Sequence, residues 1–220
     1  MFKEKFYRTK DSKYPTAKVS FEESDKLFIA VWSWGAADGG QKALDIIKDY
    51  YLSARTDIEA TSPFPLNPEQ SLAANHLRIG VMLANNIIAK ENNSEEYTTG
   101  IEVLCMSKSQ REINIAHVGG PSIISLRDNQ KPTVYLQQNH LGHEFNFKVT
   151  NPLPKDLLGI KQKQNVNVQS IRSIENEKFL LVQRNYIPIL DLKDNSLEKI
   201  EDSLVSDNKD LPFWICEFRL

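Results

Sequence analysis

Histidine and cysteine, which often bind metals or act as nucleophiles, occur in few informative arrangements in this chain. His140 and His143 are three residues apart, and on a helix this spacing would place both rings on one face, as a metal site requires. Gly142 lies between them and favours a loop, so we expect an exposed pair. Cys105 and Cys216 lie far apart in apolar segments. We therefore expect two buried thiols in a reducing compartment, which favours a cytoplasmic location.

The glycine-rich segment from Gly35 to Gly40 lacks the spacing of the phosphate-binding motifs. It matches neither G-x-x-x-x-G-K-[ST] nor G-x-G-x-x-G, and the chain contains no G-x-S-x-G. The 220 residues include 27 Lys and Arg against 29 Asp and Glu, a net charge of −2. A nucleic-acid partner is not expected from this balance. No apolar run reaches the roughly 18–20 residues that cross a bilayer, so no membrane span is expected.

The first half of the chain has the pattern of one strand followed by two helices. Leu27–Trp32 is a continuous apolar run of strand length. Apolar residues then recur at helical spacing over residues 43–54, which predicts a helix with one buried face. Asn67, Pro68 and Gln70 have the pattern of an N-cap with a capping box, so a second helix is predicted from there to about Lys90.

From residue 100 onward the apolar pattern changes from helical to extended. A short helix is expected within residues 189–204. Short strands with hairpin-length loops, which predict a meander, are expected at Gly100–Ser107, Ile113–Val118, Ser122–Leu126, Thr133–Leu136, Asn165–Ile174, Phe179–Val182 and Phe213–Phe218. Helices followed by clustered strands indicate an α+β protein. Residues 1–20 are expected to be a flexible or edge arm, and residues 21–220 a single domain.

Four parts of the sequence, in this order, resemble the metal-dependent Ser/Thr protein phosphatases of type 2C. They are FIAVWSWGAADGGQKALDII (Phe28–Ile47), IAHVGGPSIISLRDNQ (Ile115–Gln130), LPKDLLGI (Leu153–Ile160) with FLLVQRN (Phe179–Asn185), and the tail from Asp210 to Leu220. The resemblance implies a four-layer αββα sandwich of two mainly antiparallel sheets flanked by helices. It also implies a site at which aspartates bridge two divalent ions, Mg²⁺ or Mn²⁺, which make a hydroxide nucleophile.

This sequence departs from the family at the implied metal positions. Ser33, Gly120 and Arg184 stand where the family has aspartates; Asp210 matches a family ligand, and a slipped register would add Asp38. Two like unit charges about 4 Å apart cost about 4 kcal/mol at an effective dielectric near 20, so an arginine among divalent ions would repel them. We therefore predict a degenerate metal site with no catalytic residue and no metal cofactor.

These departures lead to three functional hypotheses. The first is a catalytically inactive, phosphatase-like domain that acts as a scaffold or regulatory module for a protein partner, such as a phosphoprotein or a kinase. The second is a divergent Mg²⁺- or Mn²⁺-dependent phosphatase with ligands at Asp25, Asp38 and Asp210. The third is a module that reads phosphate through Arg184 without hydrolysing it.

Two tryptophans flank the first of these implied metal positions. Trp32 and Trp34 lie on either side of Ser33. Indoles at this point would fill the volume of a metal cleft with apolar surface. They are expected either to pack in the core at the end of the strand or to form an aromatic interaction patch over a blocked cleft.

Overall fold

The computed structural model describes most of the 220 residues and divides them into two compact units. The described residues are 2–10, 12, 14–35, 39–56, 62–94, 99–109, 111–127, 130–137, 154, 156–184, 187, 188, 190 and 196–220. The first unit comprises residues 1–16, 121–155 and 175–219, and the second comprises residues 17–120, 156–174 and 220. Each unit contains one five-stranded antiparallel sheet.

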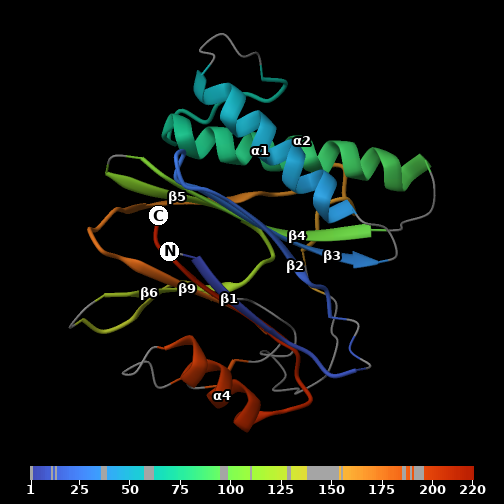
Figure 1. The fold of residues 1–220 in the computed structure, drawn as a ribbon. Helices are drawn as coiled ribbons and strands as arrows, with labels where there is room; N and C mark the ends of the chain where they lie inside the picture. The colour runs from blue at the N-terminus through green and yellow to red at the C-terminus, as the bar shows by residue number, and fades with distance from the viewer. Residues whose placement is uncertain are drawn as a thin grey trace. The chain divides into compact units, whose positions relative to one another are not determined.

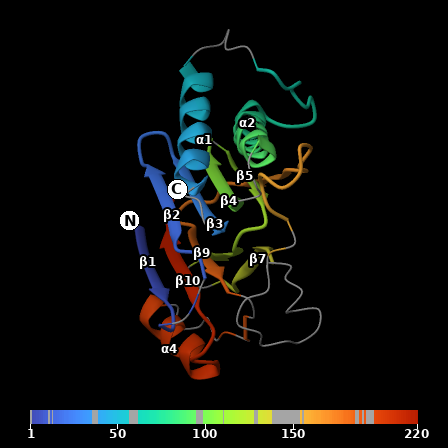
Figure 2. The same cartoon turned by 90° about the vertical axis from the view of Figure 1, so that its right-hand side faces the viewer.

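The sheet of the second unit has the strand order β2-β3-β4-β5-β8 and carries two helices on one face (Figure 1). The strands are β2 (Ala17–Glu22), β3 (Leu27–Gly35), β4 (Thr99–Lys108), β5 (Glu112–Val118) and β8 (Asn167–Arg172). The helices α1 (Gly39–Thr56) and α2 (Leu72–Ser94) lie side by side over these strands, as Figure 2 shows.

Alternation along the strands explains why the helices bind this face. Leu27, Ile29 and Val31 of β3 join alternate residues of β4 and the apolar faces of α1 and α2 in one core. The intervening residues Phe28 and Trp32 are also buried. A strand that is buried on both faces needs a continuous apolar sequence, which is why the run predicted at Leu27–Trp32 shows no polar alternation.

The sheet of the first unit has the strand order β1-β10-β9-β6-β7. Its strands are β1 (Phe2–Tyr7), β6 (Ser122–Leu126), β7 (Thr133–Leu136), β9 (Lys178–Gln183) and β10 (Phe213–Phe218), and its helix is α4 (Leu197–Asp207). Leu197, Ile200 and Leu204 of α4 pack on alternate residues of β6, β9 and β10. Ser196 caps this helix, since its side chain accepts a hydrogen bond from the backbone N–H of Lys199.

The second helix begins later than its sequence pattern predicted. Asn67–Gln70 is a turn: the backbone N–H of Gln70 donates to the carbonyl of Asn67 at 3.1 Å. The Asn67 side chain accepts from the backbone N–H of Glu69 at 3.0 Å, which is the local bond with which asparagine favours turns. Ser71 is the actual cap, since its hydroxyl accepts from the N–H of Ala74. The prediction of an N-cap at Asn67 was therefore wrong.

The predicted meander was wrong in two places. β5 is followed along the chain by β6, and β8 by β9, but in each case the second strand belongs to the other sheet. Between β5 and β6 the chain passes through Gly119 and Gly120, which both have positive φ values of 63° and 91°. This conformation favours glycine, and it makes a sharp turn where a two-residue hairpin would have continued the same sheet.

Residues 1–20 supply β1 and the first four residues of β2, which are outer strands of the two sheets. The division into an arm of residues 1–20 and a domain of residues 21–220 stays a prediction. Within the described part of the chain, no helix is both long enough and apolar enough to cross a membrane. Both cysteines are free and buried, as expected, and burial raises the pKa of each thiol.

Candidate functional site

The end of β3 in the second unit holds Ser33, the first of the positions at which the sequence implied a metal site. Ser33 and Trp34 are consecutive, so their side chains lie on opposite faces of the sheet. On the face of Ser33, its hydroxyl lies 3.1 Å from the Thr99 hydroxyl, a hydrogen-bond distance. A hydroxyl pair therefore occupies the position at which the resemblance implied the first metal-binding aspartate.

The face of Trp34 contains a buried carboxylate that sequence reasoning missed. Glu102 on β4 is fully buried. Its Oε2 accepts a hydrogen bond from Nε1 of Trp34 at 2.9 Å, and its Oε1 accepts one from the backbone N–H of Gly120 at 3.0 Å. Buried charges need such donors, because removing an isolated carboxylate from water is costly. Glu102 thus joins the end of β3 to the turn after β5.

The turn at Gly119 and Gly120 fits tightly around this carboxylate. A Cβ atom on Gly119 would lie 2.8 Å from Oε1 of Glu102, and its φ of 63° also favours glycine. At Gly120 the φ of 91° makes any aspartate strained. Nδ1 of His117 donates to the Gly119 carbonyl at 3.0 Å, and burial lowers the pKa of this histidine. The position of the second implied aspartate is therefore a backbone donor in a tight turn.

Arg184, the third implied position, lies in the first unit and stabilises the end of α4. Its side chain is completely buried. Its Nη2 donates to the carbonyls of Leu204 and Asn208, both at 3.0 Å, and its Nη1 lies 3.4 Å from Oδ2 of Asp207. A cation at a helix C-terminus is favourable because the last carbonyls lack partners within the helix. This burial does not favour the suggested contact with a phosphate, which stays a prediction.

The remaining candidate ligands do not come together in the described part of the chain. Asp210 is exposed, and its backbone N–H donates to the side chain of Asn208 at 2.9 Å. Asp38, like His140 and His143, lies outside the described residues. Among the residues that are described, no group of three His, Cys, Asp or Glu side chains could hold a metal ion.

The two tryptophans beside Ser33 are buried, Trp32 completely and Trp34 with 8% of its surface exposed. This burial agrees with packing at the end of the strand, and the aromatic interaction patch stays a prediction. Trp32 lies opposite Glu102 in the register of β3 and β4. Once β3 and β4 are paired, the alternation of side chains along the strands places Glu102 on the same face as Trp34. It does not reveal that the indole of Trp34 and the backbone N–H of Gly120 both donate to Glu102.

Comparisons with solved structures identify the fold. No protein-family model and no curated protein matches this sequence. The serine/threonine phosphatase PstP/Ppp of Mycobacterium tuberculosis matches 99% of this chain over 97% of its own, with a TM-score of 0.65 and 13% identity. The chain has the fold of the type 2C Ser/Thr phosphatases. The PPM Ser-Thr phosphatase MsPP from Mycobacterium smegmatis matches 100% of this chain over 98% of its own, with a TM-score of 0.67 and 12% identity.

A third match, Stp1 from Staphylococcus aureus, covers 100% of this chain and 95% of its own at a TM-score of 0.60 and 16% identity. These matches extend over nearly the whole chain in both directions. They confirm the predicted α+β class and the type 2C phosphatase fold of two antiparallel sheets with helices. At these identities the likeness establishes the fold, and the chemistry has to be argued from the residues of this chain.

Proposed function

We propose that this chain is a catalytically inactive type 2C phosphatase-like domain that acts as a scaffold or regulatory module for a protein partner. The proposal rests on the hydrogen bonds that Glu102 accepts. This buried carboxylate accepts hydrogen bonds from the indole of Trp34 and the backbone of Gly120. It is thus held by N–H donors beside Gly120, one of the positions at which the resemblance implied a metal-binding aspartate.

The implied cofactor is a pair of Mg²⁺ or Mn²⁺ ions, and the residues at the implied positions do not fit it. Hard divalent cations are bound by several carboxylate or carbonyl oxygens. One of the solved structures, the catalytic domain of PstP, is in complex with 2 manganese ions. In this chain, the described positions offer the Ser33–Thr99 hydroxyl pair, a glycine turn and the buried Arg184. We therefore derive no metal-dependent step for this domain.

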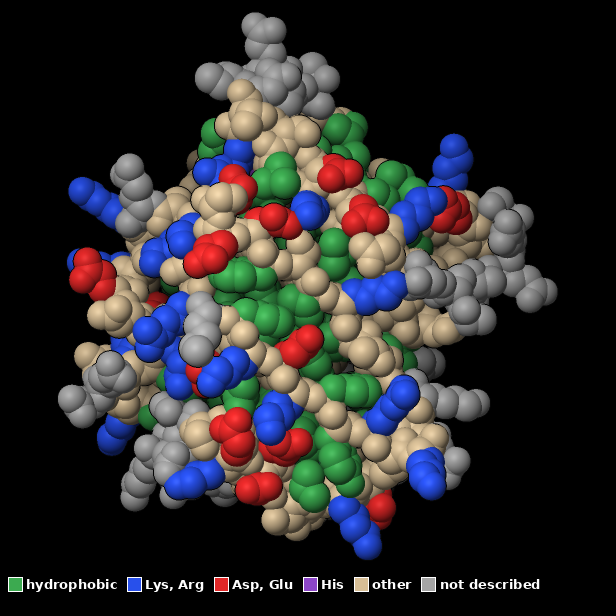
Figure 3. All heavy atoms as spheres, in the orientation of Figure 1, with side chains coloured by type: hydrophobic (Ala, Val, Ile, Leu, Met, Phe, Trp, Pro, Cys, Tyr) green, Lys and Arg blue, Asp and Glu red, His purple; other side chains and the backbone are tan. Residues whose placement is uncertain are grey.

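The proposed partner is a protein, such as a phosphoprotein or a kinase, in the cytoplasm. On the face drawn in Figure 3, basic and acidic side chains are interspersed. With the net charge of −2, this distribution supports a protein partner over nucleic acid, which is bound through extended basic surface. PppA of Pseudomonas aeruginosa, which shares the fold at a TM-score of 0.66, is described as a key regulatory component of the T6SS. That protein's role supports the proposal of a regulatory function for this chain.

The two alternative functions receive less support from the structure. Arg184 is buried and donates to the backbone carbonyls of Leu204 and Asn208, so its guanidinium gives little support to a phosphate-reading role. Asp25, one of three ligands suggested for a divergent phosphatase, pairs with Arg55 at 2.9 Å. A divergent phosphatase would need this pair to break before Asp25 could reach a metal ion.

The test combines hydrolysis with metal binding. Purified protein is assayed against p-nitrophenyl phosphate and a phosphothreonine peptide with excess Mn²⁺, and Mn²⁺ is titrated calorimetrically. We expect no turnover and no binding heat. Turnover that disappears in Asp210→Ala would overturn the proposal. Turnover that Asp210→Ala leaves unchanged, without binding heat, would identify a contaminating phosphatase.

A further inference from the structure

A pocket of about 700 Å³ lies in the second unit, beside the two helices. Residues of α1, the start of α2, the segment from Ser62 to Ser71 and the end of β4 line it. Its volume is in the range that holds a small organic ligand. Neither Ser33, Trp34, Glu102 nor Gly120 lines this pocket, so it is separate from the degenerate metal positions.

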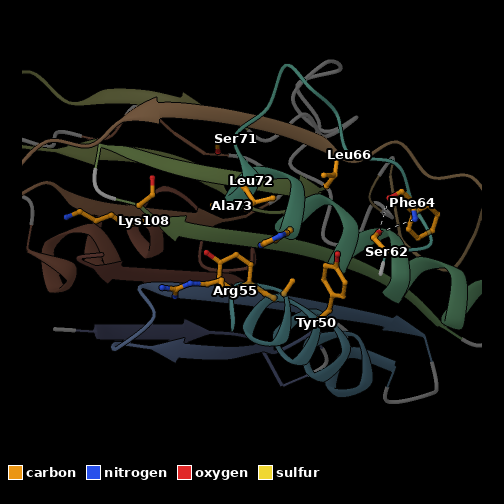
Figure 4. A pocket seen from close by; sticks show the side chains of 13 residues that line it. Tyr50, Arg55, Ser62, Phe64, Leu66, Ser71, Leu72, Ala73 and Lys108 are labelled. Atoms are coloured by element: carbon orange, nitrogen blue, oxygen red, sulfur yellow. Dashed lines mark hydrogen bonds between the residues drawn. The ribbon is translucent and has the colours of Figure 1, made fainter. Parts of the chain in front are cut away.

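Both cations of the pocket lie at one end, where Arg55 lies over the ring of Tyr51, and two further aromatic side chains lie at the other end. Figure 4 shows Arg55 and Lys108 at one end, and Tyr50 and Phe64 at the opposite end. None of the described residues that line the pocket is an aspartate or a glutamate. A ligand with a negative group and a flat apolar body would therefore meet complementary surfaces along its length.

The cations at this end keep hydrogen-bonding capacity for a ligand. Nη1 of Arg55 donates to the backbone carbonyl and to Oδ1 of Asp25, at 3.0 and 2.9 Å. The guanidinium carries five N–H donors in a planar fork, so its other edge can bind a carboxylate while this pair persists. Nζ of Lys108 donates to the carbonyl of Leu220 at 3.0 Å, and an ammonium has three donors.

A buried histidine in the pocket wall supplies an independent indication of a ligand. His76 is only 8% exposed, and its Nδ1 has no hydrogen-bond partner among the described residues. The ring stands edge-on to Tyr50 and Tyr51, with 6.4 Å between ring centroids in both cases. A buried polar atom without a partner costs about 1–3 kcal/mol, so such atoms are rare unless they serve a purpose.

We propose that this pocket binds a small aromatic carboxylate. The carboxylate lies against Arg55 and Lys108 and supplies an acceptor for Nδ1 of His76, and the ring packs against the aromatic side chains of Tyr50 and Phe64. Edge-to-face packing of this kind adds to the apolar area that the ligand buries. The site goes beyond the proposed scaffold role and does not depend on it: a domain without phosphatase activity could still sense a metabolite here.

The probe is naphthalene-2-carboxylate, and its neutral counterpart naphthalene-2-carboxamide has the same ring without the charge. Dissociation constants are measured by calorimetry on the full chain. We expect the acid to bind at least tenfold more tightly than the amide, and added NaCl to weaken the acid alone. Equal affinities for the two compounds, or no binding of the acid at millimolar concentration, would overturn the proposal.

Lys108→Gln and the matched control Lys90→Gln localise the binding. Lys90 lies on α2 and lines a different pocket of the same unit, so both variants lose one charge from the same unit. We expect Lys108→Gln to weaken the acid about fivefold or more and Lys90→Gln to leave its affinity unchanged. Equal losses in both variants would show attraction to the overall charge and would refute the site. Arg55→Lys, which keeps the charge but loses the planar fork, should also weaken binding, and thermal unfolding verifies that each variant is folded.

Discussion

Replacing Glu102 tests whether its carboxylate is a structural acceptor or a metal ligand. In Glu102→Ala, the indole N–H of Trp34 and the backbone N–H of Gly120 lose their acceptor inside the protein. Hydrogen bonds to charged groups contribute about 1.5–3 kcal/mol each, so the free energy of unfolding should fall by about 3–6 kcal/mol. This is a large fraction of the roughly 5–15 kcal/mol that stabilises a typical domain.

Glu102→Gln is the milder form of the same test. The amide oxygen can still accept from one of the two N–H groups, but the amide nitrogen, itself a donor, then faces the other. We expect a loss of about 1–3 kcal/mol, the cost of one buried donor without a partner. Glu23→Gln is the control, because Glu23 is exposed on the turn before β3 and should change stability by less than about 0.5 kcal/mol.

Urea titration of the metal-free protein measures these differences, and calorimetry with Mn²⁺ is run on the same samples. Glu102→Gln and Glu23→Gln of equal stability would refute the structural role of Glu102. Mn²⁺ binding in the natural protein that Glu102→Gln abolishes would show instead that Glu102 holds a metal. The two interpretations therefore give opposite results in the two measurements.

Three further changes test other parts of the structure. Arg184→Met removes the donor to the carbonyls of Leu204 and Asn208 at the end of α4 and one partner of the Asp207 pair. It should lower the free energy of unfolding by about 2–5 kcal/mol in urea titration, and a loss below about 1 kcal/mol would contradict its capping role. Asn92→Ala leaves two buried carbonyls without their donor at 2.7 Å and should cost about 2–3 kcal/mol in thermal unfolding, so an unchanged midpoint would count against this contact. Burial, and then Arg55, lowers the pKa of His76, so its contribution to stability is complete above pH 6.5 and is lost as the pH falls toward the lowered value. His76→Phe should reduce the fall in stability between pH 7 and pH 5, and an unchanged slope would oppose this reasoning.

The strands and helices were largely predictable, because apolar periodicity is a local property of the sequence. β3 and α1 follow the predicted residues closely. The start of α2 was missed because Asn67, Pro68 and Gln70 fit a helix cap and a turn equally well by residue type. The buried Asn75 decides between them: its side chain bonds the backbone N–H and carbonyl of Asn67 and holds the turn in place.

The pairing of strands was less predictable, because it depends on contacts between distant segments. Loops of hairpin length suggested that β5 pairs with β6 and β8 with β9, but each of these connections leads to the other sheet. The two positive φ values at Gly119 and Gly120 could be suspected from the glycine pair alone. The partner that makes this turn necessary, Glu102, lies 18 positions before Gly120 and becomes visible only when β4 and β5 are placed side by side.

In the candidate site, the contacts of single residues were also unpredictable, because they depend on segments far apart in the sequence. The resemblance to the type 2C phosphatases indicated that Arg184 stands where an aspartate is expected. It could not indicate where the guanidinium points, because that depends on where α4 ends. Its carbonyl partners, Leu204 and Asn208, lie 20 and 24 residues after Arg184 in the sequence. They come close to Arg184 only because α4 packs on its sheet. The sequence alone suggested that Arg184 binds phosphate, whereas in the structure it donates to the carbonyls at the end of α4.

The proposed function has to explain how the fold could persist without a metal pair. Clustered carboxylates repel one another when no cation lies between them, so a bimetal site reduces the stability of the metal-free protein. Here the first implied position forms a hydroxyl pair with Thr99, and the second donates its backbone N–H to Glu102. On the proposed function, each position would hold, in place of a carboxylate that needs a metal, a group that the protein itself satisfies. On the proposed function, Ser33→Asp should therefore lower the free energy of unfolding in the absence of metal, because a charged carboxylate would replace a neutral hydroxyl beside Thr99.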